Sequence, residues 1–222
     1  MSDKSTPSTV ETIRQAFSYV TRFKNRLFVI KIADSLISHD LFPLFIRDVV
    51  LLHRMGIRIA LVPGARSRID QVLETFNIAW TSNQGTRITP PEAMQYVKMA
   101  ASDVTNLILT LLAENSANGV VGNWVRARSI GVRDGVDYRS SGLVESVQTD
   151  IVAHTIDDGL IPIFPNVGWS ASGTPYNISS NSLALTLAKE LRAAKLFFAT
   201  DTDAIHTDRF TAPEGAELTE NG

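Results

Sequence analysis

The chain has 222 residues, of which 44% are hydrophobic and 20% charged, and its formal net charge at pH 7 is −2. Such a length and composition are typical of a soluble globular protein made of one large domain or two small ones. The 21 basic residues are scattered rather than striped, which argues against nucleic acid as a partner. No apolar run approaches the ~20 residues that span a bilayer, so a membrane is not expected either.

The absence of cysteine limits the chemistry further. Without cysteine the chain has no disulfide, no thiolate metal site and no thiol nucleophile, and we assign no metal ligands. The first residues lack the apolar segment of a secretory signal. Both features are compatible with the cytoplasm, which is the expected location.

Residues 1–26 are predicted to be a polar tail followed by a helix. Val10, Ile13, Phe17 and Val20 recur on one side of that helix. Because this apolar stripe precedes the first strand, the helix could form an arm that lies on its own domain or docks on a neighbouring subunit. The residues alone favour the first alternative.

The first strand is predicted over Leu27–Ile32 and contains Lys31. A lysine inside a hydrophobic strand either lies near the strand end with its head in water or is held there to meet an anion. The residues alone leave both alternatives open. Residues 33–35 then turn the chain toward a helix that is expected to end at Gly56, since glycine favours helix ends.

An anion-binding corner is predicted after the second strand, which covers residues 57–63. That strand runs into Gly64, and Ile69, Val72 and Leu73 follow at helical spacing. The N–H groups in the first turn of a helix have no intrahelical partner, and the helix dipole favours negative charge there. This turn can therefore hold a phosphate or carboxylate, although the same geometry also closes purely structural turns.

The next segment contains a candidate clamp for a carboxylate. Residues 83–88 are expected to form a loop or short hairpin arm, and Thr89–Glu92 reads as a capping box with proline at the first helical position. This box predicts a helix that continues to about Asn115. Arg87 lies just before it, and its guanidinium offers a bidentate fork for a carboxylate; the alternative is an ordinary surface arginine.

From residue 119 to residue 147 the pattern becomes short and β-like. The Asp134-Gly135 pair is a hairpin signal, so this segment is predicted to be an antiparallel flap over one edge of a mainly parallel sheet. A helix is expected over Thr149–Asp158, ended by Gly159, and a strand over Leu160–Phe164.

The last predicted unit begins at Tyr176–Ser182, whose serines and asparagines are typical N-caps of a following helix. A strand over Leu196–Thr200 follows. The alternation of strands and helices predicts a doubly wound parallel sheet that binds ligands outside the carboxyl ends of its strands. Lys31, Gly64 and Thr200 all fall at or near such ends, which points to a small anionic ligand.

Six blocks of sequence occur in this order: Val29–Lys31, Val62–Arg66, Gly85–Thr89, Gly142–Val147, Tyr176–Ile178 and Thr200–Ile205. Together they resemble the amino-acid kinase family, and most of all its acetylglutamate kinase branch. The turn at residues 64–66 and the segment 131–138 are similar to those of bacterial N-acetylglutamate synthases. In that group the fold forms an N-terminal regulatory domain ahead of an acetyltransferase domain. The resemblance covers roughly residues 17–205.

The resemblance implies an α/β fold, a three-layer αβα sandwich with a mainly parallel central sheet, here incomplete at its C-terminal end. In such kinases a lysine of the first strand bridges the transferred phosphate, glycines cradle phosphoryl oxygens and an arginine clamps the substrate carboxylate. The matching ligand-binding positions are Lys31, Gly64, Ala65, Arg66, Arg87 and Asn177. An aspartate that orients the lysines of these kinases is replaced here by Asn181.

Several positions depart from the kinase pattern. The paired glycines that follow the first lysine in the family are Ala33 and Asp34 here, and the glycines after Gly64 are replaced by Ala65 and Arg66. At ~4 Å and an effective dielectric constant near 20, Asp34 would repel each phosphate charge by about 4 kcal/mol. Phosphoryl transfer depends on positioning and electrostatic stabilisation, so the kinase site is interpreted as degenerate and without catalytic residues.

The resemblance also implies a domain division: an N-terminal tail and helix over 1–26, a partial amino-acid kinase-like domain over 27–210 and a C-terminal tail over 211–222. No acetyltransferase domain is found, so we expect either a fragment or a truncated relative. No cofactor is assigned to this chain, and acetyl-CoA is expected only for the missing acetyltransferase domain.

The leading hypothesis is thus a regulatory domain, inactive as a kinase, that binds arginine or N-acetylglutamate. The helix before the first strand resembles the N-terminal helix by which arginine-sensitive relatives form hexameric rings, which implies a homo-oligomer. The alternative is an active acetylglutamate kinase that phosphorylates N-acetyl-L-glutamate with ATP.

Overall fold

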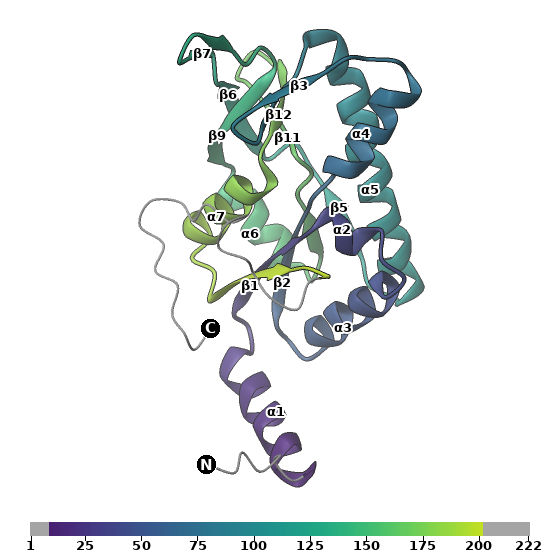
Figure 1. Cartoon of the computed structure of the whole chain (residues 1–222). Coiled ribbons are helices and arrows are strands. Elements are labelled where there is room, and N and C mark those ends of the chain that lie inside the picture. The colour runs from purple at the N-terminus through teal and green to yellow at the C-terminus, as the bar shows by residue number, and fades with distance from the viewer. Residues whose placement is uncertain (1–8, 202–222) are drawn as a thin grey trace, which may run out of the picture.

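The computed structural model describes residues 9–201 and is built around a parallel five-stranded sheet (Figure 1). The strand order is β13-β1-β2-β10-β5, and every pairing within it is parallel. These strands are β1 (Leu27–Ile32), β2 (Arg58–Pro63), β5 (Gly119–Val121), β10 (Ile161–Ile163) and β13 (Lys195–Ala199). The predicted tails, residues 1–8 and 211–222, and the end of the last block, residues 202–205, lie outside the described residues.

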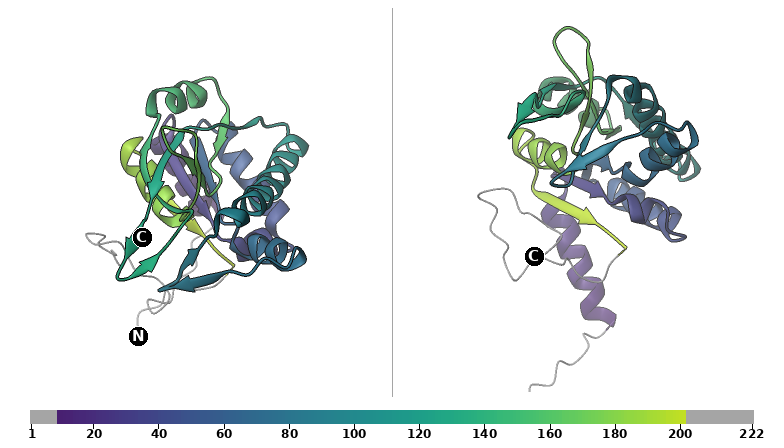
Figure 2. Two further views of the ribbon diagram at one scale, coloured as in Figure 1. Left: turned by 90° about the horizontal axis from the view of Figure 1, so that it is seen from above. Right: turned by 45° about the horizontal axis from the view of Figure 1, so that its top comes forward.

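Helices cover both faces of this sheet, which gives the expected three layers (Figure 2). One face carries α2 (Asp34–Ile37), α3 (Phe42–Arg54), α4 (Arg66–Thr75) and α5 (Met94–Glu114), and the other carries α6 (Thr149–Asp157) and α7 (Ser180–Glu190).

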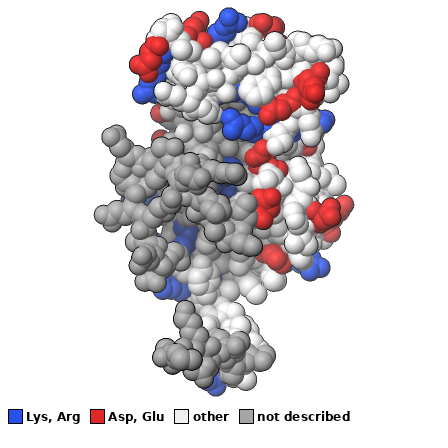
Figure 3. All heavy atoms as spheres, viewed as in Figure 1, with Lys and Arg blue, Asp and Glu red and all other residues white. Residues whose placement is uncertain are grey.

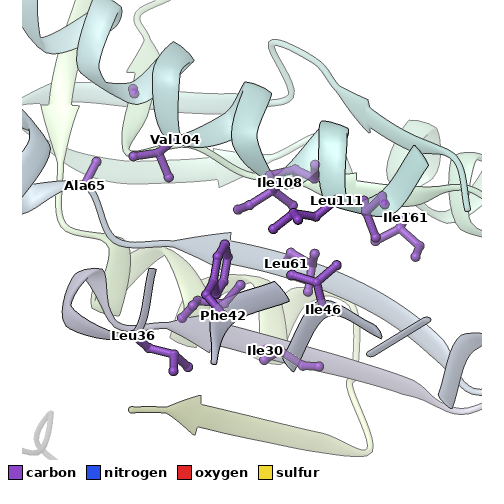
Figure 4. Packing of buried hydrophobic residues seen from close by; sticks show 14 of the residues in the cluster. Ile30, Leu36, Phe42, Ile46, Leu61, Ala65, Val104, Ile108, Leu111 and Ile161 are labelled. Carbon is purple, nitrogen blue, oxygen red and sulfur yellow. The ribbon is translucent and has the colours of Figure 1, made fainter. Parts of the chain in front are cut away.

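Successive side chains of β1 point to opposite faces of the sheet and pack into two hydrophobic clusters. Phe28, Ile30 and Ile32 point into the cluster formed with α3, α4 and α5, whereas Val29 packs in the cluster formed with α6 and α7. Figure 4 shows the first cluster, in which Ile30 and Leu61 of the sheet face side chains of the covering helices. A strand buried on both faces reads as a continuous apolar run, which is why β1 and β2 could be predicted from the sequence.

The second part of the fold differs from the predicted flap. Four strands close into a small barrel: β6 (Val125–Ser129), β9 (Ser141–Val147), β11 (Val167–Trp169) and β12 (Pro175–Ile178). β5, which was expected in the flap, belongs instead to the parallel sheet. The antiparallel pairing predicted for this segment is confirmed between β6 and β9. The prediction that it forms a flap over a sheet edge was wrong, because β11 and β12, which complete the barrel, come after α6 in sequence.

Two hairpins extend from this frame. One joins β3 (Thr81–Asn83) to β4 (Thr86–Ile88), and the other joins β7 (Val132–Arg133) to β8 (Val136–Asp137). Asp134 and Gly135 form the turn of the second hairpin at φ values of 51° and 76°, which confirms the predicted turn.

The capping box predicted at Thr89 is not formed. A short 3₁₀ turn, η1 (Pro91–Ala93), precedes α5, and no side chain caps either start. The Thr89 hydroxyl lies instead within hydrogen-bond distance of the side chains of Ser141 and Asn177. A competing tertiary network therefore replaces the local cap, while the predicted end of α5 near Asn115 is confirmed.

The predicted N-terminal helix is present as α1 (Thr9–Phe23) and extends away from the sheet (Figure 1). Its C-terminal end is anchored by aromatic contacts from Phe23 to Phe28, with ring centroids 5.2 Å apart, and from Phe28 to Phe197 at the same distance. Its apolar stripe is exposed, with Phe17 68% accessible. Within residues 9–201, no helix is both long and apolar enough to cross a membrane.

The visible surface mixes charges of both signs. In Figure 3, acidic and basic side chains are interspersed with uncharged ones, and the described residues on this face form no continuous basic stripe.

Candidate functional site

A cleft of about 270 Å³ opens at the carboxyl ends of β1 and β2. Its walls come from the turn into α4, the β3–β4 hairpin, the barrel strands β9 and β12, and the first turn of α7. Parallel strands present their carboxyl ends at one edge, so a ligand site was expected here. Thr200, predicted near such a strand end, does not line this cleft, but the candidate site residues do: Lys31, Gly64, Ala65, Arg66, Arg87, Asn177 and Asn181.

Gly64 allows the ends of β1 and β2 to approach each other. A Cβ atom at this position would lie 3.1 Å from the Asp34 nitrogen, 3.2 Å from the Ile32 oxygen and 3.3 Å from Lys31 Nζ. Two of these three neighbours are backbone atoms, which cannot move away easily. The missing side chain therefore leaves room for both the crossing backbone and the Lys31 ammonium.

Asp34 occupies the anion-binding corner predicted at the start of α4. Its Oδ2 accepts hydrogen bonds from the Ser67 backbone nitrogen at 3.0 Å and from the Ser67 hydroxyl at 2.6 Å. Ser67 is the second residue of α4, so the carboxylate satisfies a first-turn N–H group that an external anion would otherwise use. The chain thus supplies its own anion at this corner.

Lys31 and Asp34 perturb each other. Burial lowers the pKa of Lys31, and the nearby Asp34 charge opposes this effect only in part. Burial would raise the pKa of Asp34, but the hydrogen bonds from Ser67 and the Lys31 charge bring that pKa below its ordinary value. Lys31 is only 8% accessible, which argues against the first alternative, a head in open water, while the second alternative stays a prediction.

Arg87 is held rigidly and is not a surface arginine. Its side chain is only 7% accessible, and its Nη2 donates to Asp70 Oδ1 at 2.5 Å. The guanidinium carbon lies 3.8 Å from the centroid of the Trp80 ring, a cation–π stack. Among the described residues, Nη1 has no hydrogen-bond partner although it is buried. The guanidinium therefore has one nitrogen, Nη2, that is paired, and one, Nη1, that has no partner in this part of the chain.

A chain of polar side chains connects the far wall of the cleft to the same arginine. Asn166 Nδ2 donates to Asn177 Oδ1 at 2.9 Å, and Asn177 Nδ2 donates to Thr89 Oγ1 at 3.0 Å. Ser141 Oγ lies 2.9 Å from Thr89 Oγ1 and donates to the Arg87 carbonyl at 2.5 Å. Asn166 Oδ1 is buried without a partner within the described part of the chain.

The remaining predicted positions have simpler roles. Arg66 Nη2 donates to the carbonyl of Gly85 at 2.9 Å, which ties α4 to the tip of the β3–β4 hairpin. Ala65 is buried before α4, and Asn181 is exposed at the start of α7. An amide at Asn181 carries no charge with which to orient a lysine.

Sequence reasoning missed Asp70, Trp80, Ser141 and Asn166. Only Asn166 had a usable signal, since it is a polar residue shortly after the buried strand β10 and therefore near the carboxyl edge of the sheet. The others lie on a helix, before an edge hairpin and in a barrel strand. Their meeting with Arg87 depends on tertiary packing.

The fold and the cleft together define an α/β domain that binds small ligands at the carboxyl edge of a parallel sheet. Residues 26–221 match the family model described as the amino acid kinase family. The chain therefore belongs to the amino acid kinase family.

The chain is also similar to particular proteins. It is 34% identical to the amino-acid acetyltransferase of Proteus mirabilis over 205 residues, which cover 88% of this chain and 46% of that protein. The amino-acid acetyltransferase of Salmonella typhimurium gives 34% over 196 residues, which cover 84% of this chain and 44% of that protein. The chain thus spans about half the length of these curated relatives.

Solved structures agree with this similarity. The N-acetylglutamate synthase of Neisseria gonorrhoeae complexed with coenzyme A and L-arginine superposes with a TM-score of 0.83 and 26% identity, covering 90% of this chain and 49% of that one. The same enzyme complexed with coenzyme A and N-acetyl-glutamate gives 0.82 and 28%, with coverages of 90% and 47%. Carbamate kinase from Giardia lamblia, at 14% identity and a TM-score of 0.57, shares the fold.

Proposed function

We propose that this chain is a regulatory domain of the N-acetylglutamate synthase type that binds a small carboxylate and is inactive as a kinase. Arginine and N-acetylglutamate are the candidate ligands. In a whole synthase, an acetyltransferase domain would transfer acetyl from acetyl-CoA to the amine of glutamate, the first step of arginine biosynthesis, and arginine would inhibit through this domain. We assign no cofactor to the domain itself, and a cytoplasmic location is expected.

The observation that supports this proposal most strongly is the Asp34 carboxylate at the start of α4. A nucleotide whose terminal phosphates approached this corner would meet a fixed negative charge that already uses the Ser67 N–H group. At ~4 Å the repulsion is about 4 kcal/mol for each pair of charges at an effective dielectric constant near 20. Asn181 supplies no compensating charge, so several parts of a phosphoryl-transfer site are missing at once.

The other end of the cleft suits a carboxylate. Arg87 lines this end of the cleft, and its positive charge is held in place by the stack on Trp80 and the ion pair with Asp70. A guanidinium that is already oriented attracts a carboxylate with little further ordering of its side chain. The ligand would therefore bind beside Arg87 and away from Asp34.

Isothermal titration of the chain with L-arginine and with N-acetyl-L-glutamate tests this proposal. One of the two should bind, and Arg87→Ala should weaken that binding at least about tenfold because a charged hydrogen bond is lost. Arg58→Ala is the matched control, since Arg58 also pairs with an aspartate, Asp157, but does not line the cleft. Equal affinities of wild type and Arg87→Ala would contradict the proposed site.

The alternative function is an active acetylglutamate kinase. The presence of Lys31 in the cleft is the observation that favours it. A coupled assay for ADP release with N-acetyl-L-glutamate and Mg-ATP distinguishes the two functions. We expect no turnover above background. Turnover that Lys31→Ala abolishes would establish the kinase and overturn the regulatory proposal.

We further propose that α1 joins copies of the chain into an oligomer. Its exposed stripe includes Val10, Ile13 and Phe17, which are 57%, 49% and 68% accessible. Neighbouring exposed apolar residues of this size indicate an interaction site.

A further inference from the structure

The outer face of α3 carries a row of exposed apolar side chains that has no role in the function proposed so far. Leu44, Leu51 and Met55 are 41%, 51% and 39% accessible, whereas the opposite face of the helix is buried in the core. Asp48 is exposed in the same row. These four residues follow one another at separations of four and three residues, so they lie on one side of the helix. We call them the α3 stripe.

The exposed side of α1 has the same spacing. Val10, Ile13 and Phe17 are 57%, 49% and 68% accessible, and the exposed Arg14 lies among them. We call these four residues the α1 stripe. Alternating separations of three and four residues are the pattern by which two helices pack along their length. The two stripes therefore match each other in geometry.

Neither stripe covers the other within one copy of the chain, since both are exposed in the same structure. α1 extends away from the sheet (Figure 1), and its C-terminal end is fixed by Phe23, which is only 8% accessible. The ring of Tyr19 packs on Phe23 with centroids 4.6 Å apart. An arm whose base is held in this way loses less conformational entropy when it docks on another molecule.

The two stripes also carry charges of opposite sign. Arg14 lies in the α1 stripe and Asp48 in the α3 stripe, and neither forms an ion pair among residues 9–201. Packing of α1 on α3 lets these two charges meet, whereas a symmetrical pairing of two α1 helices or two α3 helices brings like charges together. Charges beside an apolar seam select the partner helix in this way.

We infer that the α3 stripe is the surface that receives the α1 stripe of a second copy of this chain. The inference rests on the proposed role of α1 in joining copies and deepens it, because it supplies the surface on which α1 docks. No residue of either stripe lines the cleft, so this contact is separate from the ligand site.

Cross-linking tests this inference directly, because the chain has no cysteine of its own. One preparation carries Arg14→Cys, and a second, with a larger affinity tag, carries Asp48→Cys; both leave every apolar residue of the stripes in place. After mixing and treatment with a short bis-maleimide, the mixed dimer should be the main product on a denaturing gel. Asp150→Cys is the matched control, since Asp150 is also exposed but lies on α6, and it should not cross-link to Arg14→Cys. Cross-links between two Arg14→Cys chains as the main product would overturn the inference.

Charge reversal provides a second measurement. Arg14→Glu and Asp48→Arg should each raise the dissociation constant of the oligomer at least about tenfold in analytical ultracentrifugation, because each brings like charges together. The two changes combined in one chain should restore it to within about threefold of wild type. An oligomer that both single reversals leave unchanged would overturn the inference and leave the role of α1 standing. A wild-type chain that is monomeric at every concentration would overturn both, whereas carboxylate binding is judged by its own titration.

Discussion

At the residue scale, the central feature is that Asp34 places a carboxylate where a phosphate-binding turn would hold its ligand. The Ser67 amide and hydroxyl both donate to this carboxylate, and Lys31 adds a positive charge nearby. One acidic residue thus stabilises the start of α4 and opposes an external anion at the same point.

Asp34→Ala should therefore lower stability in a pH-dependent way. The pKa of Asp34 is lowered from 3.8, so its contribution is present above that pH and is lost as the pH falls through the lower folded-state pKa. At pH 7 the loss of a cap of this kind costs about 1 kcal/mol of unfolding free energy. Urea unfolding of both proteins at neutral pH and at decreasing acidic pH measures the difference and its disappearance.

Asp48→Ala is the control for this experiment, because Asp48 is exposed on α3. Its effect should stay within about 0.5 kcal/mol. An Asp34→Ala protein as stable as wild type at pH 7 would show that the bonds to Ser67 do not stabilise α4.

Asp70 is expected to act through Arg87, since it pairs with Nη2 and does not itself line the cleft. Asp70→Asn removes the charge that fixes the guanidinium, so affinity for the bound carboxylate should fall about tenfold in a titration. Asp103→Asn breaks another ion pair to α4, that of Arg68, and should leave affinity unchanged. Tighter binding by Asp70→Asn would mean that Asp70 competes with the ligand.

At the element scale, the close approach of the β1 and β2 ends depends on Gly64. Gly64→Ala places a Cβ atom 3.1 Å from the Asp34 nitrogen and 3.2 Å from the Ile32 oxygen, so backbone must shift. Overpacking of this kind costs about 1–3 kcal/mol, and thermal unfolding should show a lower midpoint. An unchanged midpoint would indicate that the strand ends have room to separate.

The helix α1 provides a second prediction at this scale. If its exposed stripe joins copies of the chain, Ile13→Ser combined with Phe17→Ser should lower the mass measured by light scattering after gel filtration, because apolar contact area is lost. Leu41→Ser is the matched control, since Leu41 is 57% accessible but lies outside α1. A wild-type chain that is already monomeric at high concentration would contradict the proposed role of α1.

At the scale of the whole molecule, the sequence predicted the parallel sheet well. β1 matched its predicted bounds of Leu27–Ile32, and both ends of β2 and α6 and the C-terminal end of α5 lay within one residue of expectation. Doubly buried strands and glycine-marked helix ends are local signals, so they can be read without tertiary information. The same signals placed Lys31 and Gly64 at one edge, whereas Arg87 was assigned to the site through the family resemblance.

The parts that could not be predicted depend on contacts between distant segments. The barrel joins β6 and β9 to β11 and β12, which follow α6 in sequence. Thr89 does not cap a helix as expected but forms hydrogen bonds with the side chains of Ser141 and Asn177. The same network includes Asn166, whose side-chain oxygen is buried without a partner among residues 9–201. Local propensity yields to tertiary hydrogen bonding at such positions.

This family member is proposed to bind a carboxylate and not a nucleotide in its cleft. Titration of the unaltered chain with ATP in the presence of Mg²⁺ tests this claim most directly. We predict a dissociation constant weaker than about 1 mM, because the Asp34 charge opposes the terminal phosphates. Magnesium-dependent binding of ATP in the micromolar range would contradict the account.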